Sequence, residues 1–389
     1  MRLADRMGRL GTETAFEVLA RARALEAEGR DVIHLEVGEP DVETPAHVIE
    51  AGREALAAGW THYGPAPGDP ELRAAIAETI NRDRGTSYQP TQAIVCPGAK
   101  PIMFFALLAL VQAGDEVIYP DPGFPIYGSM VTFSGATPVP IPLREERGFA
   151  LDVDELERLI TPRTRMLIVN TPGNPTGGVI PPADLERIAA LAVKHDLWVL
   201  SDEIYAQIIF EGEHVSLATF PGMAERTILL DGFSKTYAMT GWRLGYGLLP
   251  AELVDPFTKL MVNSVSCASV AVQRAGLAAL TGPQDDVVMM REAFQRRRDL
   301  VVSGLNAIDG LSCATPAGAF YVFPNISATG MTSAAFAGNL LQEQAVATIA
   351  GTSFGRHGEG YIRLSTANSD ENLTRAVDRI AAFVAGRAG

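Results

Sequence analysis

Cysteine is scarce in this sequence, with only Cys96, Cys267 and Cys313 among 389 residues. The three are widely separated, and they show neither the ligand spacing of a zinc site nor the even-numbered framework of a disulfide-rich secreted protein. We therefore expect a chain suited to a reducing compartment, with no metal site.

Long apolar runs are also missing. No window of about eighteen uncharged apolar residues is available for a membrane span. The first residues, MRLADRMGRLGTETAF, lack the continuous apolar segment of a secretory signal. The sequence thus predicts a cytoplasmic protein with no membrane partner.

Positive charge is in deficit, because 46 acidic side chains against 32 basic ones give a formal net charge of -14. Such a surface repels nucleic-acid phosphates and anionic lipids unless basic residues are concentrated somewhere. The densest basic cluster, Arg296, Arg297 and Arg298, is interpreted as the solvent-facing side of a helix. No nucleic-acid partner is expected.

The sequence does contain a regular alternation of helical segments and short apolar runs, which starts at Ala46. This alternation predicts an α/β fold, with a mostly parallel sheet sandwiched by helices. The apolar runs that we predict as strands are 116–119, 166–170, 197–201, 227–231 and 244–249. Helices are predicted over 70–81 and within PPADLERIAALAVKHD, where apolar residues recur at helical spacing.

The length of the chain predicts two packed lobes. We assign residues 46–285 to a large domain. A smaller α+β domain is expected from residues 1–45 together with 286–389. The strand-like segments GAFYVFPN and GYIRLS belong to this smaller domain.

One lysine stands out, in the segment LLDGFSKTYAMTGWRLG, where Lys235 follows a buried-looking strand and Arg243 comes later in a Gly-flanked turn. The ordinary interpretation is a loop lysine whose charged end reaches solvent. In a partly dry site, however, a lysine is more often neutral, and a neutral amine forms an imine with an aldehyde cofactor. Ser234 and Arg243 would add donors suited to a phosphate group.

Four segments together resemble one family. SKTYAMTGWRLG is similar to the cofactor-lysine motif of the class I aminotransferases, within the class I/II family and the fold type I pyridoxal-phosphate enzymes. VNTPGNPTGG, VLSDEIYAQIIF and GYIRLSTA resemble further motifs of that family, in the expected order. The resemblance implies a seven-stranded sheet in the large, cofactor-binding domain. It also implies pyridoxal 5'-phosphate bound to Lys235 as a Schiff base, and ping-pong transfer of an amino group from an L-amino acid to a 2-oxo acid.

The resemblance also implies roles around the cofactor ring. Asp202 would face the ring nitrogen and keep it protonated, so that the ring withdraws electrons. Asn174 and Tyr205 would hydrogen-bond the phenolic oxygen, and Phe124 would stack on the ring. The expected catalytic residues are Lys235, Asp202 and Tyr205. As isolated residues, they could instead be a helix cap, turn residues or core aromatics.

The phosphate is expected at the turn formed by Gly98, Ala99 and Lys100, because the amides at a helix N-terminus bind anions. Pro101 stands where relatives usually have a residue that donates its amide, so one contact is expected to be missing. Tyr63 resembles the residue that reaches the phosphate in the neighbouring subunit. The resemblance therefore implies a homodimer with shared active sites. The alternatives are a plain strand-to-helix turn at Gly98, Ala99 and Lys100, and an ordinary loop tyrosine at Tyr63.

Substrate binding is assigned by the same resemblance. Arg363 in GYIRLS would grip the α-carboxylate of the substrate with its fork of donors, and Gly38 and Asn174 would lie beside it. A structural ion pair at Arg363 and a turn glycine at Gly38 are the alternatives. Lys100 matches a lysine that contacts the second carboxylate of acidic substrates in some relatives, so an aspartate-like donor is predicted.

Three other functions share much of this pattern. Elimination chemistry, as in a C–S lyase, and decarboxylation use the same cofactor residues and differ in the group that leaves the α-carbon. A ligand-sensing regulator could also keep the fold. Transamination is favoured because it is the commonest activity of the family and because the lysine is intact.

Overall fold

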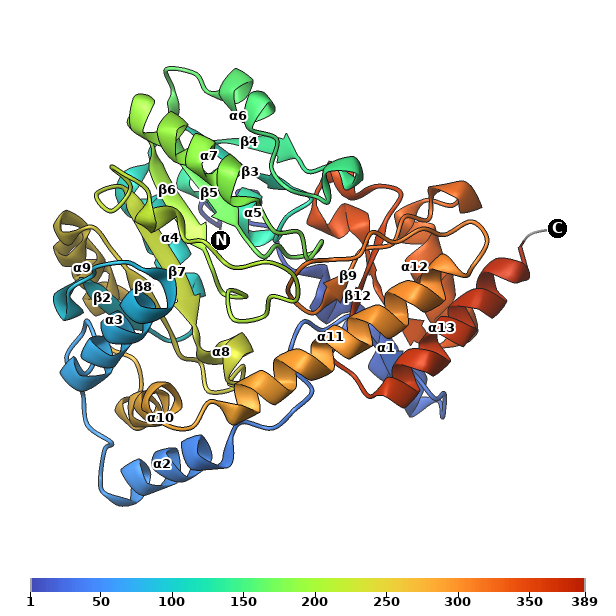
Figure 1. The fold of residues 1–389 in the computed structure, drawn as a ribbon, viewed down its shortest axis with the longest axis horizontal. Helices are drawn as coiled ribbons and strands as arrows, with labels where there is room; N and C mark the ends of the chain where they lie inside the picture. The colour runs from blue at the N-terminus through green and yellow to red at the C-terminus, as the bar shows by residue number, and fades with distance from the viewer. Residues whose placement is uncertain (1, 388–389) are drawn as a thin grey trace.

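The computed structural model describes residues 2–387, and a seven-stranded sheet forms its centre (Figure 1). The strand order is β2-β8-β7-β6-β5-β3-β4. The strands are β2 (Ala93–Cys96), β3 (Glu116–Asp121), β4 (Thr137–Pro142), β5 (Thr164–Asn170), β6 (Trp198–Asp202), β7 (Thr227–Gly232) and β8 (Gly245–Leu248). All neighbours pair in parallel except β8, which is antiparallel to both β2 and β7. The predicted α/β class and mostly parallel sheet are confirmed.

Helices cover both faces of this sheet. The α-helices of the two lobes together are α1 (Thr14–Ala27), α2 (Ala46–Ala57), α3 (Pro70–Arg84), α4 (Lys100–Leu110), α5 (Ile126–Ser134), α6 (Val153–Leu159), α7 (Pro182–Lys194), α8 (Phe233–Thr236), α9 (Val254–Ser264), α10 (Val270–Thr281), α11 (Asp285–Asn306), α12 (Ser333–Gln344) and α13 (Asp370–Ala385), of which α1, α12 and α13 pack in the smaller lobe. The predicted helix over 70–81 is therefore one turn short of α3, and PPADLERIAALAVKHD contains α7 as expected.

Alternate residues of the strands explain why both faces are buried. In β7, Ile228 and Leu230 join the apolar cluster around α4 and α9, whereas Leu229 joins the cluster around α3 and α10. Successive side chains of a strand point to opposite faces, so an all-apolar strand has to be covered twice. The large apolar cores therefore lie directly above and below the sheet.

A smaller lobe is built from short strands and the last helices. β1 (Ile33–His34) pairs in parallel with β10 (Val346–Ala347), which joins the N-terminal segment to this lobe. A three-stranded sheet has the order β11 (Ile349–Ala350), β12 (Ile362–Ser365) and β9 (Tyr321–Val322). The long helix α11 runs from the large lobe to the small one (Figure 1). The division at residues 45/46 and 285/286 remains a prediction.

The arginine cluster on α11 differs from its interpretation as a solvent-facing surface. Only Arg296 is exposed. Arg297 pairs with Asp41 at 2.9 Å, and the buried Arg298 pairs with Glu211 at 2.9 Å. The prediction was wrong for these two residues because α11 lies between the lobes, where loops from other parts of the chain meet its arginines.

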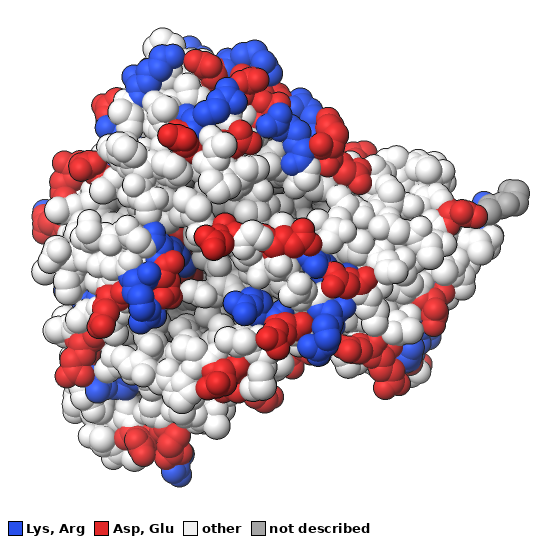
Figure 2. Space-filling model, in the orientation of Figure 1, with Lys and Arg blue, Asp and Glu red and all other residues white. Residues whose placement is uncertain are grey.

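The charges of the surface are mixed on the face seen in Figure 2, where Lys and Arg side chains alternate with Asp and Glu around a central hollow. Within residues 2–387, no helix is long and apolar enough to cross a membrane.

Candidate active site

A cavity of about 960 Å³ opens between the large sheet and the small lobe. The sequence-predicted site residues that line it are Gly38, Ala99, Lys100, Phe124, Asn174, Asp202, Tyr205, Ser234, Lys235, Arg243 and Arg363. They come from segments far apart in the chain, and the carboxyl ends of β6 and β7 supply the floor. Of the remaining predicted residues, Gly98 is buried beside Arg243 and does not line the cavity, and Tyr63 lies elsewhere on the surface with 89% of its area exposed.

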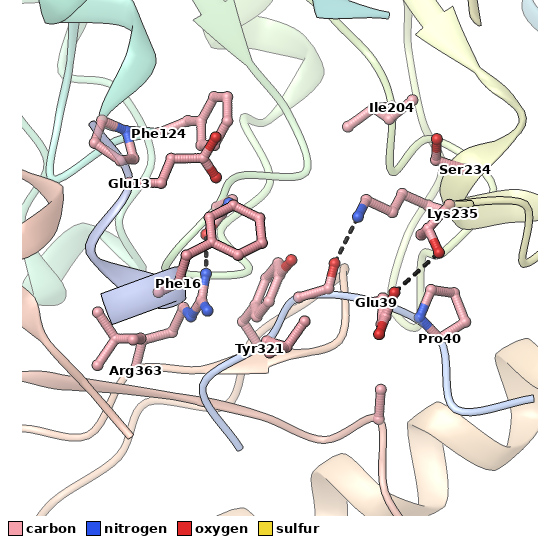
Figure 3. A pocket seen from close by; sticks show the side chains of 18 of the residues that line it. Glu13, Phe16, Glu39, Pro40, Phe124, Ile204, Ser234, Lys235, Tyr321 and Arg363 are labelled. Carbon is pink, nitrogen blue, oxygen red and sulfur yellow. Dashed lines mark hydrogen bonds between the residues drawn. The ribbon is translucent and has the colours of Figure 1, made fainter. Parts of the chain in front are cut away.

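Lys235 projects into the cavity from the single turn of α8, directly after the fully buried strand β7. Its Nζ donates a hydrogen bond to the carbonyl oxygen of Gly38 at 2.5 Å (Figure 3). Burial disfavours the ammonium form and lowers the pKa of Lys235 to about 8. The site therefore holds a lysine that is readily deprotonated and lies within reach of a bound molecule.

Asp202 ends β6 and presents a buried carboxylate to the same cavity. The hydroxyl of Tyr127 donates to it at 2.6 Å, and the amide of Ile204 at 3.3 Å. Burial raises the pKa of Asp202 to about 6, and no Lys, Arg or His of residues 2–387 lies within 4.0 Å to offset this cost. A cationic ring nitrogen of a bound cofactor would be the missing partner.

The turn between β2 and α4 is close to Arg243. Gly98 has a φ of +79°, which favours glycine, and a Cβ atom there would lie 2.2 Å from Nη2 of Arg243 and displace the guanidinium. Arg243 has a φ of 54° and donates from Nη1 to the carbonyl of Thr240 at 2.8 Å. The N-terminus of α4, the guanidinium and the buried Ser234 thus fit an anionic group such as a phosphate.

Arg363 is buried on β12 and has no carboxylate partner in the described part of the chain. Its Nη1 donates to Oδ1 of Asn174 at 3.1 Å and its Nη2 to the carbonyl of Glu36, while Nε has no partner. The guanidinium lies 4.6 Å from the centre of the Tyr321 ring. The carboxylate side chain that the alternative, a structural ion pair, would need is absent among residues 2–387, so the charge is free to bind a carboxylate from outside the chain.

Tyr205 and Tyr321 share a hydrogen bond of 2.8 Å between their hydroxyl groups. Tyr321 was not foreseen from the sequence, and it also explains Gly38. A Cβ atom at Gly38 would lie 2.2 Å from the Tyr321 hydroxyl, so glycine is needed to let the 34–41 segment approach the lysine. Both tyrosines line the cavity, and Tyr321 lies between Lys235 and Arg363 in Figure 3.

Two further lining residues were missed, Glu13 and Phe16, at the start of α1. Glu13 forms an ion pair with Lys100, whose Nζ also lies 5.3 Å from the centre of the Phe124 ring. Phe16 extends over the cavity beside Arg363 (Figure 3). The segment LGTETAF has no motif that marks these contacts, and only the folded chain brings it to the site.

Comparison with known proteins identifies the family of this chain. The sequence profile described as "Aminotransferase class I and II" matches residues 30–380. The chain belongs to this aminotransferase family. The resemblance inferred from four short motifs is therefore confirmed over most of the sequence.

Relatives of this aminotransferase cover it almost completely. The aspartate aminotransferase of Pyrococcus abyssi is 44% identical and aligns over 90% of this chain and 91% of its own. The aromatic-amino-acid aminotransferase 2 of Thermococcus litoralis is 41% identical, with 98% and 97% covered. The solved structure of the aspartate aminotransferase from Thermus thermophilus with maleate is 41% identical, with a TM-score of 0.94 over 98% of this chain and 100% of that one.

The function follows from this family membership. The protein is an aminotransferase, and members of its family use pyridoxal phosphate as cofactor. The cavity agrees with that cofactor on three independent points: a deprotonable lysine, a buried carboxylate without a cation and an anion-binding turn.

Proposed function

We propose that Lys235 and Asp202 are the catalytic centre of this aminotransferase. Pyridoxal phosphate supplies, when bound, an electron sink that makes the α-proton of an amino acid removable. Lys235 holds the cofactor covalently between turnovers. Once released, its neutral Nζ takes the α-proton and gives it back at a neighbouring carbon. Asp202 holds a negative charge where the ring nitrogen would lie.

The neighbouring residues bind and orient. Arg243, Ser234 and the turn of Gly98, Ala99 and Lys100 hold the phosphate, and Phe124 covers the ring. Tyr205 donates its hydroxyl to the phenolic oxygen.

Asn174 is suited to two contacts, because its Oδ1 accepts from Arg363 while its Nδ2 is left to donate to the phenolic oxygen. Arg363 grips the α-carboxylate, which every amino acid and 2-oxo acid carries. Gly38 lets its segment pass close to that carboxylate.

One juxtaposition supports these roles most directly. A single cavity brings together Lys235, the unpaired carboxylate of Asp202 and the unpaired guanidinium of Arg363. An amino acid fixed by its carboxylate at Arg363 would place its α-carbon toward the lysine. A buried charge without a partner is costly, so two of opposite sign in one cavity favour a ligand that satisfies both.

The side chain of the donor is proposed from Lys100. Its ammonium group lines the cavity and would bind a second carboxylate, so an aspartate-like donor is proposed, and relatives are named for aspartate as well as aromatic substrates. Lys100 is already paired with Glu13, however, so a dicarboxylic substrate has to displace that contact.

A donor screen tests the proposed function. The holoenzyme is mixed with single amino acids, the cofactor absorbance is followed, and pyruvate, oxaloacetate and 2-oxoglutarate are then added as acceptors. We expect at least one donor to change the absorbance and to release its 2-oxo acid. Release of ammonia would indicate elimination instead. If no donor changes the absorbance, the proposed function is wrong.

We also propose a homodimer with shared active sites, in which Tyr63 reaches the cofactor of the partner subunit. Its exposed ring fits this role, and Leu56 and Val262 are also exposed, at 60% and 55%.

A cytoplasmic location remains a proposal as well, to be tested by cell fractionation.

A further inference from the structure

Arg84 lies on the opposite face of the sheet from the cavity and has no role in the proposed chemistry. It ends α3, and its side chain is 2% exposed. Its Nη2 lies 2.5 Å from Oδ2 of Asp231, and its Nη1 lies 3.0 Å from Oε2 of Glu203. One buried guanidinium thus joins carboxylates from two neighbouring strand ends.

Both carboxylates are next to the proposed catalytic residues in the chain. Glu203 directly follows Asp202 at the end of β6, and Asp231 lies in β7, just before the turn that presents Lys235. Successive residues of a strand point to opposite faces, so Asp202 faces the cavity while Glu203 faces Arg84. In the same way Leu230 lines the cavity and Asp231 does not.

Further polar groups surround the two carboxylates that Arg84 joins. The hydroxyls of Ser201 and Ser216 donate to Oε1 of Glu203 at 2.9 and 2.7 Å, and Nε2 of His214 lies 2.8 Å from its Oε2.

On the β7 side, Asp231 accepts from the amide of Gly232 at 2.6 Å and from the hydroxyl of Tyr246 at 3.3 Å. Tyr88 also lies near the cluster, and its hydroxyl has no hydrogen-bond partner within residues 2–387. Arg84 is thus the cation shared by both carboxylates.

We propose that Arg84 is a positioning residue for the active site. By joining Glu203 to Asp231 it ties the ends of β6 and β7 together, and so fixes Asp202 relative to Lys235. It also offsets the two negative charges that lie behind Asp202. This inference rests on the proposed roles of Asp202 and Lys235.

The charge of Arg84 should reach the cavity. Glu203 and Asp231 both act to raise the pKa of Asp202, and Arg84 acts to lower the pKa of each of these two carboxylates. Without it, the cavity becomes more negative, and cationic forms of the lysine–cofactor unit hold their proton to higher pH. With one carboxylate removed instead, the cavity becomes more positive and the proton is lost at lower pH.

The test is a pH titration of the cofactor absorbance in the holoenzyme, with variants of opposite charge. Arg84→Met should raise the midpoint by roughly half a pH unit or more, and Arg84→Lys should restore most of this shift. Asp231→Asn should lower the midpoint. If Arg84 only stabilised the fold, Arg84→Met and Asp231→Asn would not shift the titration midpoint in opposite directions. Asp231→Asn also keeps the test valid if Arg84→Met does not fold.

Arg298 offers a matched control, because it is also a buried, ion-paired arginine but lies on α11. Arg298→Met should lower Tm without moving the midpoint. If Arg84→Met and Asp231→Asn leave the midpoint unchanged while the wild-type enzyme converts amino donors, the inference is overturned and the proposed function stands. If the wild-type enzyme converts no donor, the proposed function itself fails.

Discussion

Burial is the main reason why Lys235 can act both as an attachment point and as a base. An exposed lysine has a pKa near 10.4, so only a very small fraction is neutral at neutral pH. In this cavity the pKa of Lys235 is about 8, because burial disfavours the charged form. The same neutral amine can bind an aldehyde and accept a proton.

This shift predicts a pH dependence for cofactor attachment to the apoenzyme. Only the neutral amine attacks the aldehyde, and a lowered pKa means that the neutral form is gained as the pH rises through about 8. The attachment rate, followed by absorbance after rapid mixing, should rise from pH 6 and level off above about 9. A rate that still climbs steeply above about pH 10 would show an ordinary lysine.

Glu13 is expected to limit the use of acidic donors. Glu13→Gln removes the carboxylate that occupies Lys100, so KM for aspartate should fall by about threefold to tenfold, while KM for phenylalanine changes little. Glu17→Gln, at an exposed position of the same helix, is the control for lost charge. An equal change for both donors would argue against competition at Lys100.

The position of Lys235 and Asp202 in the cavity could be predicted because each lies in a short motif that is recognisable in the sequence. Glu13 and Arg84 could not, because their partners lie 87 and 147 residues away in the sequence. A lone charged residue in a helical segment is expected to be exposed to solvent, because the sequence does not show which residues lie opposite it in the fold. The interpretation of Arg298 was wrong for the same reason.

At the scale of elements, the turn between β2 and α4 depends on glycine. Gly98→Ala would place a methyl group 2.2 Å from Arg243 at a left-handed φ of +79°. The arginine or the turn has to shift, so cofactor affinity should fall by about tenfold or more, at a cost of about 1–2 kcal/mol. Gly338→Ala, in α12 and outside the cavity, is the control, because no atom of residues 2–387 lies within 4 Å of the added Cβ. Equilibrium dialysis of the cofactor measures both, and equal affinities would contradict this account of the turn.

The strands could be predicted where they are apolar and buried on both faces. The five nominated runs all appear in the large sheet, with ends displaced by a few residues. β4 was missed because its sequence, TPVPIP, has proline at alternate positions. It lies at the edge of the sheet, where one side needs no hydrogen-bonding partner and proline is tolerated.

At the scale of the whole molecule, the site exists only because the two lobes meet. Gly38 and Arg363 come from the small-lobe side, and Lys235 and Asp202 from the ends of the large sheet. The sequence predicts the residue types of this site but not the cavity, since the cavity depends on how α11 and the 34–41 segment set one lobe against the other.

The proposed dimer can be tested by mixing two impaired variants. If Tyr63 serves the partner's site, a Tyr63→Ala chain and a Lys235→Ala chain form a mixed dimer with one complete site. Each mixed dimer should then bind the cofactor with wild-type affinity at one of its two sites. Mixtures that stay as weak as Tyr63→Ala alone would place Tyr63 outside the partner's site, and a monomer in sedimentation would exclude the dimer.

The central claim is that Lys235 both holds the cofactor and moves the α-proton. Its most direct test is a single half-reaction, in which a donor that is active with the wild-type enzyme is added to Lys235→Arg loaded with pyridoxal phosphate. Arginine keeps the positive charge but is not neutral at accessible pH. We expect one equivalent of 2-oxo acid per site from the wild-type enzyme and essentially none from the variant. Release of 2-oxo acid by Lys235→Arg at the wild-type rate would contradict the account.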